Sequence, residues 1–405
     1  MESKWKQYTI NDVCSVTDCQ HKTAPTVENK TSYRMLRTAN IRNGQLRNIE
    51  ETKSVSKEIY EQWSVRGYLE AGDVILTREA PMGEVALLSD DEKYNYFLGQ
   101  RMLQLKAYNH IITPEFLYYS LQTRELQHQI MMNEGTGSVV SNIRIPLLKK
   151  MQLSVPELKD QKKITKVLTD IDKKININNK LISNLEEISQ TLFKHWFVDF
   201  EFPNENGQSY KSSKCIMIES ELGAIPKDWK VINFEEIMKI SSGKRPKRKV
   251  NEASNENEIP IIGASKLMGY TNDALYNSPI LVIGRVGTHG VIQKIVEPCW
   301  PSDNTLVIES EFYNFVYEFL KRIDYKSLNR GSTQPLITQT DIKSQKLAFP
   351  KNSAVADKFE STVSPLLENQ FILKEENQKL SQLRDTLLPK LLSGEIEIPD
   401  EVVVN

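Results

Sequence analysis

The chain has 405 residues, of which 39% are hydrophobic, and this is enough for two to three domains with cores of their own. The net charge of −1, from 52 basic and 53 acidic residues, argues against a protein that coats nucleic acid by diffuse electrostatic attraction. No apolar run approaches the roughly 18 residues of a membrane helix, and the N-terminal segment lacks the apolar core of a signal peptide. We therefore expect a cytoplasmic protein in which any contact with nucleic acid is local.

Residues 1–154 predict a first globular domain of short strands and helices. Apolar runs bounded by Gly, Pro and Asp predict strands, and residues 116–129 have a helical pattern. Cys14 and Cys19 precede His21 in this domain, but their spacing offers at most three ligands in an unusual arrangement. We therefore expect no metal site. The predicted strands lie at 33–41, 73–77, 84–88 and 101–105.

Residues 155–202 predict a long central helix. Apolar residues recur in alternating steps of four and three, a 3.5-residue period that drives helices to pair as a coiled coil. Polar Asn178 and Ser189 interrupt this seam, and a buried Asn typically fixes register and partner in a coiled coil. The alternative, a surface helix packed on one globular core, suits about half this length. The apolar seam positions are Ile164, Leu168, Ile171, Ile175, Ile182, Leu185 and Leu192.

A polar segment at 203–221 has the composition of a linker, and residues 222–350 beyond it repeat the first domain segment by segment. Five pairs of similar segments occur in the same order in the two halves of the chain. A period of about 200 residues indicates a duplicated domain-plus-helix unit instead of a solenoid, and such a pair can form an internal pseudo-two-fold. The alignment brings together two arginines and two glycines: Arg78 with Arg285, and Gly83 with Gly290.

Residues 351–395 predict a second, more polar copy of the long helix, followed by a tail at 396–405. Asn377 lies near the middle of its seam, as Asn178 does in the first helix, so the two could meet if the helices pair antiparallel. Pro365 should kink or restart this helix. The apolar pairing positions are Val363, Leu366, Leu373, Leu380 and Leu387. The predicted fold class is α+β: two homologous domains of short strands and helices, alternating with two long helices that pair as an antiparallel coiled coil.

Sequence motifs for catalysis are missing. The chain contains no phosphate-binding G-x-x-x-x-G-K-[ST] loop, no G-x-G-x-x-G turn that opens a helix, no H-E-x-x-H pair and no G-x-S-x-G elbow. The Gly-rich segment 284–290 follows a strand but leads into no helical pattern, so we expect a tight hairpin or a backbone loop against a ligand. A chain of this length without such motifs favours binding over catalysis.

One short segment, 241–249, is strongly basic and carries five Lys or Arg residues within six positions. A loop this basic would hold backbone phosphates, and its arginines could also reach guanine edges. The alternative is an ordinary solvated loop. The corresponding segment of the first domain, 18–26, has only His21 and Lys22, so the two domains should bind different ligands. The candidate DNA-binding residues here are Lys22, Lys244, Arg245, Lys247 and Arg248.

The chain resembles the specificity subunit of type I restriction-modification systems over essentially its whole length. The resemblance is carried by VPELKDQKKI at 155–164, LEEISQTLFKHWFVDFEFP at 185–203, LGAIPKDWKV at 222–231 and LRDTLLPKLLSGEI at 383–396. The start of the second helix, KNSAVADKF at 351–359, departs from the Glu-Gln-Lys type of the family.

This resemblance implies a non-catalytic, sequence-specific reader of double-stranded DNA, with one domain for each half of a bipartite target. The helices would hold the domains at a set distance and dock two modification subunits. S-adenosylmethionine would bind to these partners, ATP and Mg²⁺ would bind to restriction subunits, and none of them would bind to this chain. The family pattern carries over Arg78, Gly83, Arg285 and Gly290 as residues of the recognition domains, and Arg37 joins them as a DNA-binding candidate.

Two other interpretations stay open on the sequence alone. The chain could be a non-catalytic scaffold, with two ligand-binding domains on a coiled-coil spacer and no role with nucleic acid. It could also be a nuclease whose site lacks a recognisable motif. A DNA affinity that falls with ionic strength would favour the DNA reader, because phosphate contacts release counterions.

Overall fold

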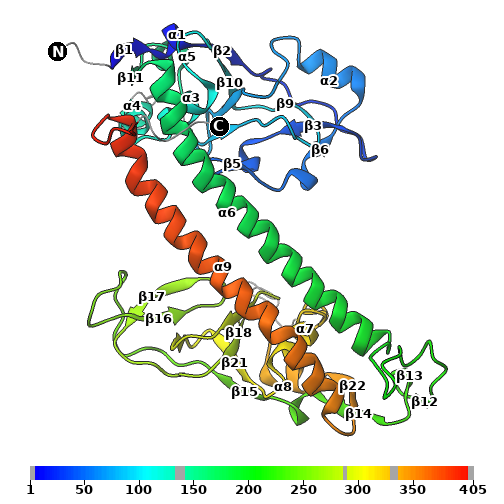
Figure 1. Ribbon diagram of the computed structural model, residues 1–405. Coiled ribbons are helices and arrows are strands. Elements are labelled where there is room, and N and C mark those ends of the chain that lie inside the picture. Colours follow the sequence, from blue (N-terminus) through cyan, green and yellow to red (C-terminus); the bar gives the residue numbers. More distant parts are fainter. Residues whose placement is uncertain (1–4, 133–141, 286–289, 329–335, 400–405) are drawn as a thin grey trace. The chain divides into compact units, whose positions relative to one another are not determined.

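The computed structural model of the chain describes residues 5–132, 142–285, 290–328 and 336–399 (Figure 1). Contacts divide the chain into two compact units. Unit 1 comprises Met1–Ile177 and Glu376–Asn405, and unit 2 comprises Asn178–Glu375. Among the helices of the described part, none combines the length and the apolar character that crossing a membrane requires.

Unit 1 contains domain 1, which runs from β1 (Lys6–Thr9) to β11 (Gln152–Val155), two strands that pair antiparallel. The main sheet has four antiparallel strands in the order β2 (Cys14–Asp18), β10 (Met102–Ala107), β7 (Val74–Thr77) and β8 (Val85–Leu87). A second sheet has the order β6 (Lys53–Ser54), β3 (Tyr33–Leu36) and β9 (Asn95–Leu98). Strands β4 (Ile41–Arg42) and β5 (Gln45–Leu46) form a small hairpin.

Short helices connect and cover these strands. They are α1 (Ile10–Val13), η1 (Thr38–Asn40), η2 (Ile49–Glu51), α2 (Lys57–Trp63), α3 (Pro114–Leu121), α4 (Arg124–Met132) and α5 (Ile145–Leu148). Helix α3 begins after Thr113, whose hydroxyl accepts a hydrogen bond from the Phe116 amide, and Pro114 occupies its first turn. The segment predicted as one helix at 116–129 is two helices, because the Thr123 hydroxyl caps the start of α4.

Unit 2 contains domain 2, which runs from β14 (Trp229–Asn233) to β22 (Lys346–Pro350), again an antiparallel pair. The main sheet has the order β15 (Lys239–Ser242), β21 (Thr305–Glu309), β18 (Ile280–Gly284) and β19 (Ile292–Ile295). The second sheet has the order β17 (Leu267–Thr271), β16 (Ile259–Ile262) and β20 (Trp300–Pro301). The helices are η4 (Phe234–Glu236), α7 (Tyr313–Leu320) and α8 (Gln339–Lys343).

A hairpin of β12 (Met217–Ser220) and β13 (Gly223–Pro226) precedes domain 2. It begins inside the segment 203–221, whose composition predicts only a linker. Ile216, Ile218 and Leu222 are exposed in and beside this hairpin, and its buried residues, Ile225 and Pro226 of β13, lie beyond that segment. Strand β12 therefore has no buried apolar face that would reveal it in the sequence.

The two domains share one topology. β3 pairs antiparallel with β6 and parallel with β9, and β16 pairs antiparallel with β17 and parallel with β20. Single backbone bonds also correspond: the Gly99 amide donates to the Leu36 carbonyl (2.8 Å), and the Ser302 amide donates to the Ile262 carbonyl (2.9 Å). The structure therefore confirms the predicted duplication and the α+β fold class.

Two long helices leave the domains: α6 (Leu158–Phe193), which ends in a π-helical turn at Lys194–Val198, and α9 (Ala354–Leu392). In unit 1, Asp172 of α6 pairs with Arg384 of α9 at 2.9 Å. In unit 2, the ring centroid of Phe193 in α6 lies 5.9 Å from that of Phe359 in α9. An early part of α6 thus meets a late part of α9 and the reverse, so the helices pair antiparallel, as predicted.

The predicted seam positions differ in burial. The seam residues at the start of α6 are buried, and Asn178 is fully buried as well. In α9, Val363 is buried, whereas the remaining predicted positions are half-buried; polar Gln370, seven residues after Val363, is buried as well. The contribution of each of these side chains to pairing stays a prediction. The buried α6 positions are Ile164, Leu168, Ile171 and Ile175; the half-buried positions are Ile182, Leu185, Leu192, Leu366, Leu373, Asn377, Leu380 and Leu387.

Pro365 was predicted to kink or restart the second helix. A restart is wrong, because α9 is continuous through this residue, and a kink stays a prediction. Pro365 is exposed, and so is Ser361, whose carbonyl loses its helical donor to the proline. Water can bind this carbonyl, so the proline costs the helix less here than in a buried turn.

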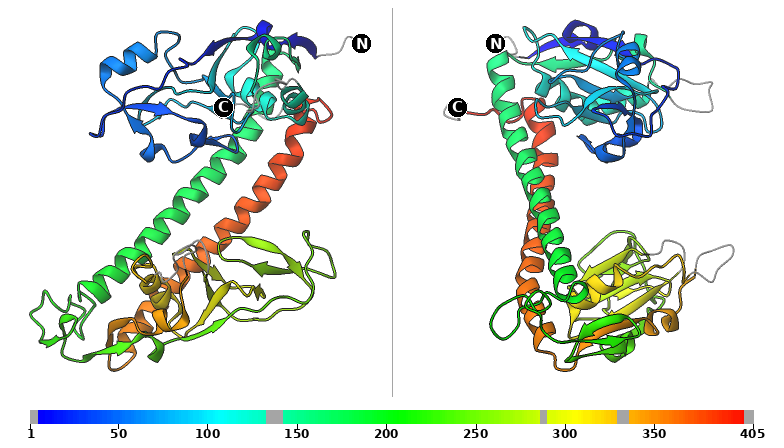
Figure 2. Two further views of the ribbon diagram at one scale, coloured as in Figure 1. Left: turned by 180° about the vertical axis from the view of Figure 1, so that it is seen from behind. Right: turned by 90° about the vertical axis from the view of Figure 1, so that its right-hand side faces the viewer.

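Each domain packs on the helix segments of its own unit. In unit 1, the strands lie to one side of these segments (Figure 2), and Leu391 and Leu392 at the end of α9 join Phe116 in the core of domain 1. In unit 2, Phe193 and Phe197 at the end of α6 pack against Phe315 of domain 2. The helices are therefore part of both hydrophobic cores.

Candidate nucleic-acid interface

The basic segment of domain 2 is a loop, residues 244–249, which follows β15 and is called the basic loop below. Its start is fixed by two hydrogen bonds: the Lys244 amide donates to the Pro301 carbonyl (3.0 Å), and the Trp300 indole donates to the Lys244 carbonyl (2.7 Å). Its end is fixed by Val250, which exchanges two backbone hydrogen bonds with Tyr270 (2.9 Å each). All five cations are exposed: Lys244, Arg245, Lys247, Arg248 and Lys249.

Within the part of the chain that the structure describes, one weak ion pair touches this loop, between Arg248 and the exposed Glu256 at 3.8 Å. An exposed pair of this length contributes little, because water screens both charges. The loop therefore presents concentrated positive charge on a backbone that is held at both ends. Such a surface suits the phosphates of a nucleic acid.

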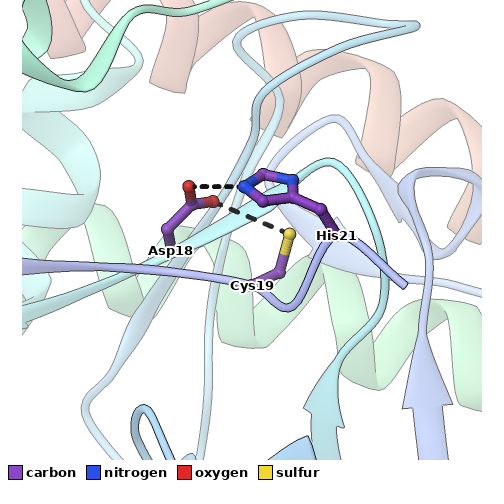
Figure 3. A group of neighbouring side chains, drawn as sticks. All are labelled: Asp18, Cys19 and His21. Atoms are coloured by element: carbon purple, nitrogen blue, oxygen red, sulfur yellow. Dashed lines mark hydrogen bonds and ion pairs between the residues drawn. The ribbon is translucent and has the colours of Figure 1, made fainter. Parts of the chain in front are cut away.

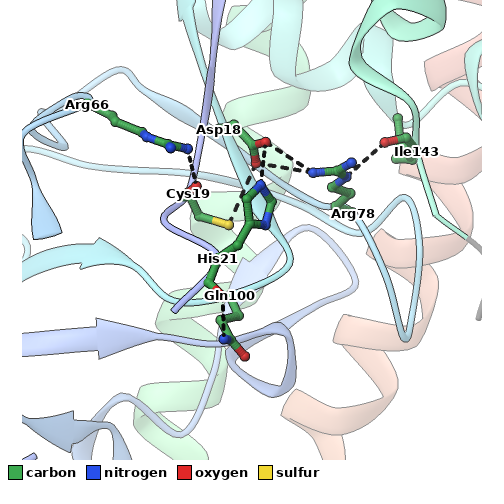
Figure 4. A network of polar contacts seen from close by, with 7 residues as sticks. All are labelled: Asp18, Cys19, His21, Arg66, Arg78, Gln100 and Ile143. Atoms are coloured by element: carbon green, nitrogen blue, oxygen red, sulfur yellow. Dashed lines mark hydrogen bonds and ion pairs between the residues drawn. The ribbon is translucent and has the colours of Figure 1, made fainter. Parts of the chain in front are cut away.

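The corresponding loop of domain 1 is held by a network of polar contacts instead (Figure 4). Asp18 accepts a hydrogen bond from the Arg78 guanidinium (3.1 Å), and the His21 ring lies 3.0 Å from the same carboxylate. The Arg66 guanidinium donates to the Cys19 carbonyl (2.7 Å), and the Gln100 amide donates to the His21 carbonyl (3.2 Å). These contacts fix residues 18–21 in one conformation.

Asp18, Cys19 and His21 place one potential metal-ligand atom each within 4.8 Å of the others (Figure 3). The surroundings oppose a cation there, because Arg78 already neutralises Asp18. Burial, the largest influence, raises the pKa of the Cys19 thiol and so disfavours the thiolate that a metal needs. The arrangement fits a hydrogen-bond network that holds the loop better than it fits a metal centre.

Arg78 and Arg285 occupy the same position of the duplicated backbone. The Arg78 amide donates to the Arg101 carbonyl (2.8 Å), and the Arg285 amide donates to the Asn304 carbonyl (2.9 Å). The Arg78 guanidinium also donates to the Ile143 carbonyl (3.0 Å), so this side chain is engaged on two sides and only 19% exposed. Its predicted role at DNA stays untested, and its visible role is to hold the loop of domain 1.

Arg285 lacks the carboxylate that binds Arg78. Asp18 stands opposite Leu103 in the main sheet of domain 1, and Ser242 stands opposite Leu306 at the same place in domain 2. Ser242 cannot form an ion pair, and its hydroxyl accepts a hydrogen bond from the Gln339 amide (3.1 Å). Arg285 is therefore the better DNA-binding candidate of the two arginines.

Gly83 and Gly290 have backbone reasons to be glycine. Their φ angles are +88° and +78°, a region that other residues rarely adopt. Gly83 is also buried, and its carbonyl accepts a hydrogen bond from the Gln127 amide (2.9 Å). Residues 286–289 of the predicted Gly-rich loop lie outside the described residues. The two glycines serve loop geometry in each domain.

Arg37, predicted from sequence as a DNA contact, borders a hollow of about 430 Å³ in domain 1, called the cationic hollow below. Sequence reasoning missed the other charged members, Lys53 and Arg101, because the topology gathers them from β6 and from the turn before β10. No Asp or Glu from the described part of the chain lines it. Lys22 is exposed but is not part of the lining. The lining residues used below are Thr23, Thr26, Arg37, Lys53, Gln100 and Arg101.

Side chains of the long helices secure the domains within each unit. In unit 1, the Tyr119 hydroxyl donates to Asp172 (2.7 Å), the carboxylate that also pairs with Arg384. In unit 2, Glu360 accepts hydrogen bonds from the Asn314 and Phe315 amides (3.1 and 2.8 Å) at the start of α7. A carboxylate at this helix end satisfies donors that have no partner inside the helix.

Two carboxyls at the contact of α6 with α7 have opposite pKa shifts. Burial alone would raise the pKa of Glu186, but the hydrogen bond from Lys321 (2.6 Å) and the charges of Lys294 and Lys321 outweigh it and lower the pKa to about 2. Burial raises the pKa of Glu318 to about 7, and its Oε1 atom has no hydrogen-bond partner among the described residues.

Comparison with known proteins gives consistent results. A family described as type I restriction modification DNA specificity domain matches residues 2–187 and 226–381. The MjaIX specificity subunit of a type I restriction enzyme from Methanocaldococcus jannaschii is 27% identical over 376 residues, with 86% of this chain and 83% of the relative covered. The HindI specificity subunit from Haemophilus influenzae is 22% identical over 400 residues, with 81% and 87% covered.

A solved structure supports the fold. The crystal structure of a type I restriction-modification S subunit from M. genitalium aligns with a TM-score of 0.62 at 18% identity, and 96% of each chain is covered. Each of the two stretches matched by the family description lies within one copy of the duplicated unit and ends before its long helix does. On these grounds, the chain belongs to the type I restriction modification DNA specificity domain family.

Proposed function

We propose that this chain is the non-catalytic specificity subunit of a type I restriction-modification complex, and that each domain recognises one half of a bipartite DNA target. The observation that carries this proposal is a common backbone framework with different charged groups on it. Asp18 of domain 1 is Ser242 in domain 2, and the loop that follows it has five cations in domain 2 alone. Two copies of one scaffold with different side chains suit the reading of two different sequences.

The charge distribution supports DNA as the ligand. A net charge of −1 gives no general attraction to phosphates, so affinity must come from local groups. The basic loop and the cationic hollow supply such groups on domains of equal topology. Phosphate contacts of this kind set the position of a protein on the duplex, while contacts with base edges give the sequence preference.

The long helices provide surface for the modification subunits. In unit 2, Leu181 and Ile188 lie seven residues apart on one face of α6 and are 44% and 51% exposed, and Ile372 of α9 is 59% exposed. In unit 1, Ile177 and Leu383 are exposed as well. Exposed apolar faces of this kind mark protein interaction sites. S-adenosylmethionine, ATP and Mg²⁺ then act on the modification and restriction subunits in the cytoplasm, and this chain supplies recognition.

Exchange of one domain tests this proposal. The β14–β22 pair closes domain 2 between Trp229 and Pro350, so residues 229–350 can be replaced by those of another family member. Methylome sequencing of a strain that carries the complex should show one altered half-site and one unchanged half-site. A change in both halves, or in neither, would contradict one domain per half-site.

A salt titration tests the role of the basic loop. Arg245→Ala with Lys247→Ala should weaken DNA binding and reduce the slope of log affinity against log salt by about 0.9 for each phosphate that the loop no longer binds. Lys211→Ala with Lys214→Ala removes the same charge from an exposed segment before β12 and serves as the control. Equal slopes in both double variants would show that the basic loop is merely solvated. A parent complex that binds no DNA would favour the scaffold.

A further inference from the structure

We infer that the two domains hold DNA backbone phosphates at one and the same place of the duplicated fold, but with cations from different segments. In domain 1 this place is the cationic hollow, with Lys53 and Arg101. In domain 2 it is covered by the end of the basic loop, with Lys249. The inference rests on the proposed function. It adds the ligand chemistry, a phosphodiester, and two residues that sequence reasoning did not find, Lys53 and Arg101.

The hydrogen-bond register defines which residues correspond. Met35 of β3 stands opposite Lys53, and Ile261 of β16 stands opposite Gly269. The equivalent bonds of Leu36 and Ile262 described above align β3 with β16, so Gly269 of domain 2 takes the place of Lys53. By the same alignment Gly263 corresponds to Arg37, and the backbone bonds of Arg78 and Arg285 make Asn304 the equivalent of Arg101. Domain 2 therefore lacks all three cations of the hollow.

In domain 2 the basic loop fills the vacated position. Gly269 has a φ of +141°, and a Cβ there would clash with the Val250 carbonyl oxygen and lie 3.2 Å from Cε of Lys249. The paired hydrogen bonds between Val250 and Tyr270 hold the loop against β17. The absence of a side chain at Gly269 thus admits the loop, and Lys249 brings a positive charge to the place that Lys53 occupies in domain 1.

The hollow of domain 1 has the chemistry of an anion site. Among the described residues, Arg37 and Lys53 have no ion pair, and Arg101 has one, to Glu79 at 3.1 Å. Thr23, Thr26 and Gln100 add neutral donors, and no carboxylate lines the hollow. A volume of about 430 Å³ is ample for a phosphate group. Two cations without an ion pair, together with hydroxyls, suit a phosphodiester of DNA.

Arg101 supports this assignment through its backbone. Its φ is +70°, which is unusual for a residue with a long side chain. The turn is fixed on both sides, because Gln100 donates to the His21 carbonyl and the Arg101 carbonyl accepts from the Arg78 amide. Positions held in a rare backbone conformation concentrate at binding sites. The hydrogen-bond network around Asp18 therefore orients one wall of the hollow.

The experiment uses the full-length chain assembled with its modification subunits and a labelled duplex at several salt concentrations. Lys53→Ala should reduce the slope of log affinity against log salt by about 0.9 and weaken target and non-target duplexes by the same factor. Lys53→Arg should keep the parent slope. The control, Lys106→Ala, removes an exposed lysine on β10, five residues and roughly 16 Å along the chain from Arg101, and should leave the slope unchanged.

Lys249→Ala should reduce the slope by the same amount in domain 2, and the double variant with Lys53→Ala should show about twice that reduction. Parent-like slopes in both single variants would overturn the inference, as would a methylome in which Lys53→Ala changes a base of the target. Inorganic phosphate at constant ionic strength should leave parent affinity unchanged; competition that disappears in Lys53→Ala would assign the hollow to a free phosphate. If the parent complex binds no duplex, the proposed function itself fails.

Discussion

The ion pair between Asp172 and Arg384 gives a quantitative test of helix pairing in unit 1. We consider Arg384→Met, which removes the charge but keeps most of the apolar stem. Asp172 would keep the hydrogen bond from Tyr119 and lose the bond from Arg384, at 2.7 and 2.9 Å respectively. The two side chains of the pair are 15% and 22% exposed, so water can replace the guanidinium only in part.

The expected cost follows from this exposure. Breaking a fully buried pair costs about 3–5 kcal/mol, and an exposed pair contributes about 0–1 kcal/mol. Because the exposure of this pair is intermediate, Arg384→Met should lower the free energy of unfolding by about 2 kcal/mol. Lys174 and Glu376 provide a matched control between the same two helices, with a separation of 3.3 Å and exposures of 47% and 40%. Lys174→Met should therefore cost less than about 0.5 kcal/mol.

Urea unfolding combined with hydrogen exchange measures this difference. Hydrogen exchange is needed because the two units can open separately, and peptides that cover 168–177 and 380–390 report on unit 1. Arg384→Met should speed exchange in both peptides far more than Lys174→Met does. A double-mutant cycle with Asp172→Ala should give a coupling energy of about 1–2 kcal/mol. Equal effects of the two Met variants, or no coupling, would refute the reasoning.

The two shifted carboxyls of unit 2 give opposite pH dependences. The raised pKa of Glu318, about 7, means that the folded state binds the proton more tightly than the unfolded state does. The free energy of unfolding therefore falls as pH rises from about 4.5 to 7. Glu318→Gln should remove this fall, and urea titrations at pH 8 should show a free energy of unfolding that is higher by about 1–3 kcal/mol. The lowered pKa of Glu186, about 2, gives stability that is fully present above about pH 4.5 and is lost as pH falls towards 2. Glu186→Gln should therefore destabilise at pH 7 and much less at pH 3, and a pH-independent effect would contradict the pairing with Lys321.

Regular patterns in the sequence predicted the fold well. The 3.5-residue period extends over all of α6, since a helix repeats its buried face along a continuous stretch of chain. The similar segments around Arg78 and Arg285 indicated the duplication in the sequence. They are similar because the same backbone hydrogen bonds need the same local geometry in both domains. The period could not show how Pro365 is tolerated, since this depends on which face of α9 meets water.

The cationic hollow could not be predicted in the same way. Lys53 and Arg101 lie 48 positions apart in the chain (101 − 53 = 48), and only the pairing of β3 with both β6 and β9 brings their segments together. No local pattern marks either residue. The basic loop could be predicted from the sequence because its cations are close together in the chain. The role of Gly269, which leaves room for this loop, could be recognised only in the structure.

The comparison of the domains explains how one fold can serve two ligands. The bonds that define the fold are backbone bonds: the amides of Arg78 and Arg285 have equivalent acceptors although their side chains have different surroundings. Domain 2 has Ser242 where domain 1 has Asp18, and this difference changes the charge beside the arginine without removing any of those bonds. Side chains at these positions can therefore vary while the strands stay in register. A domain built in this way can change the sequence that it reads without losing its core, since the two properties depend on different atoms.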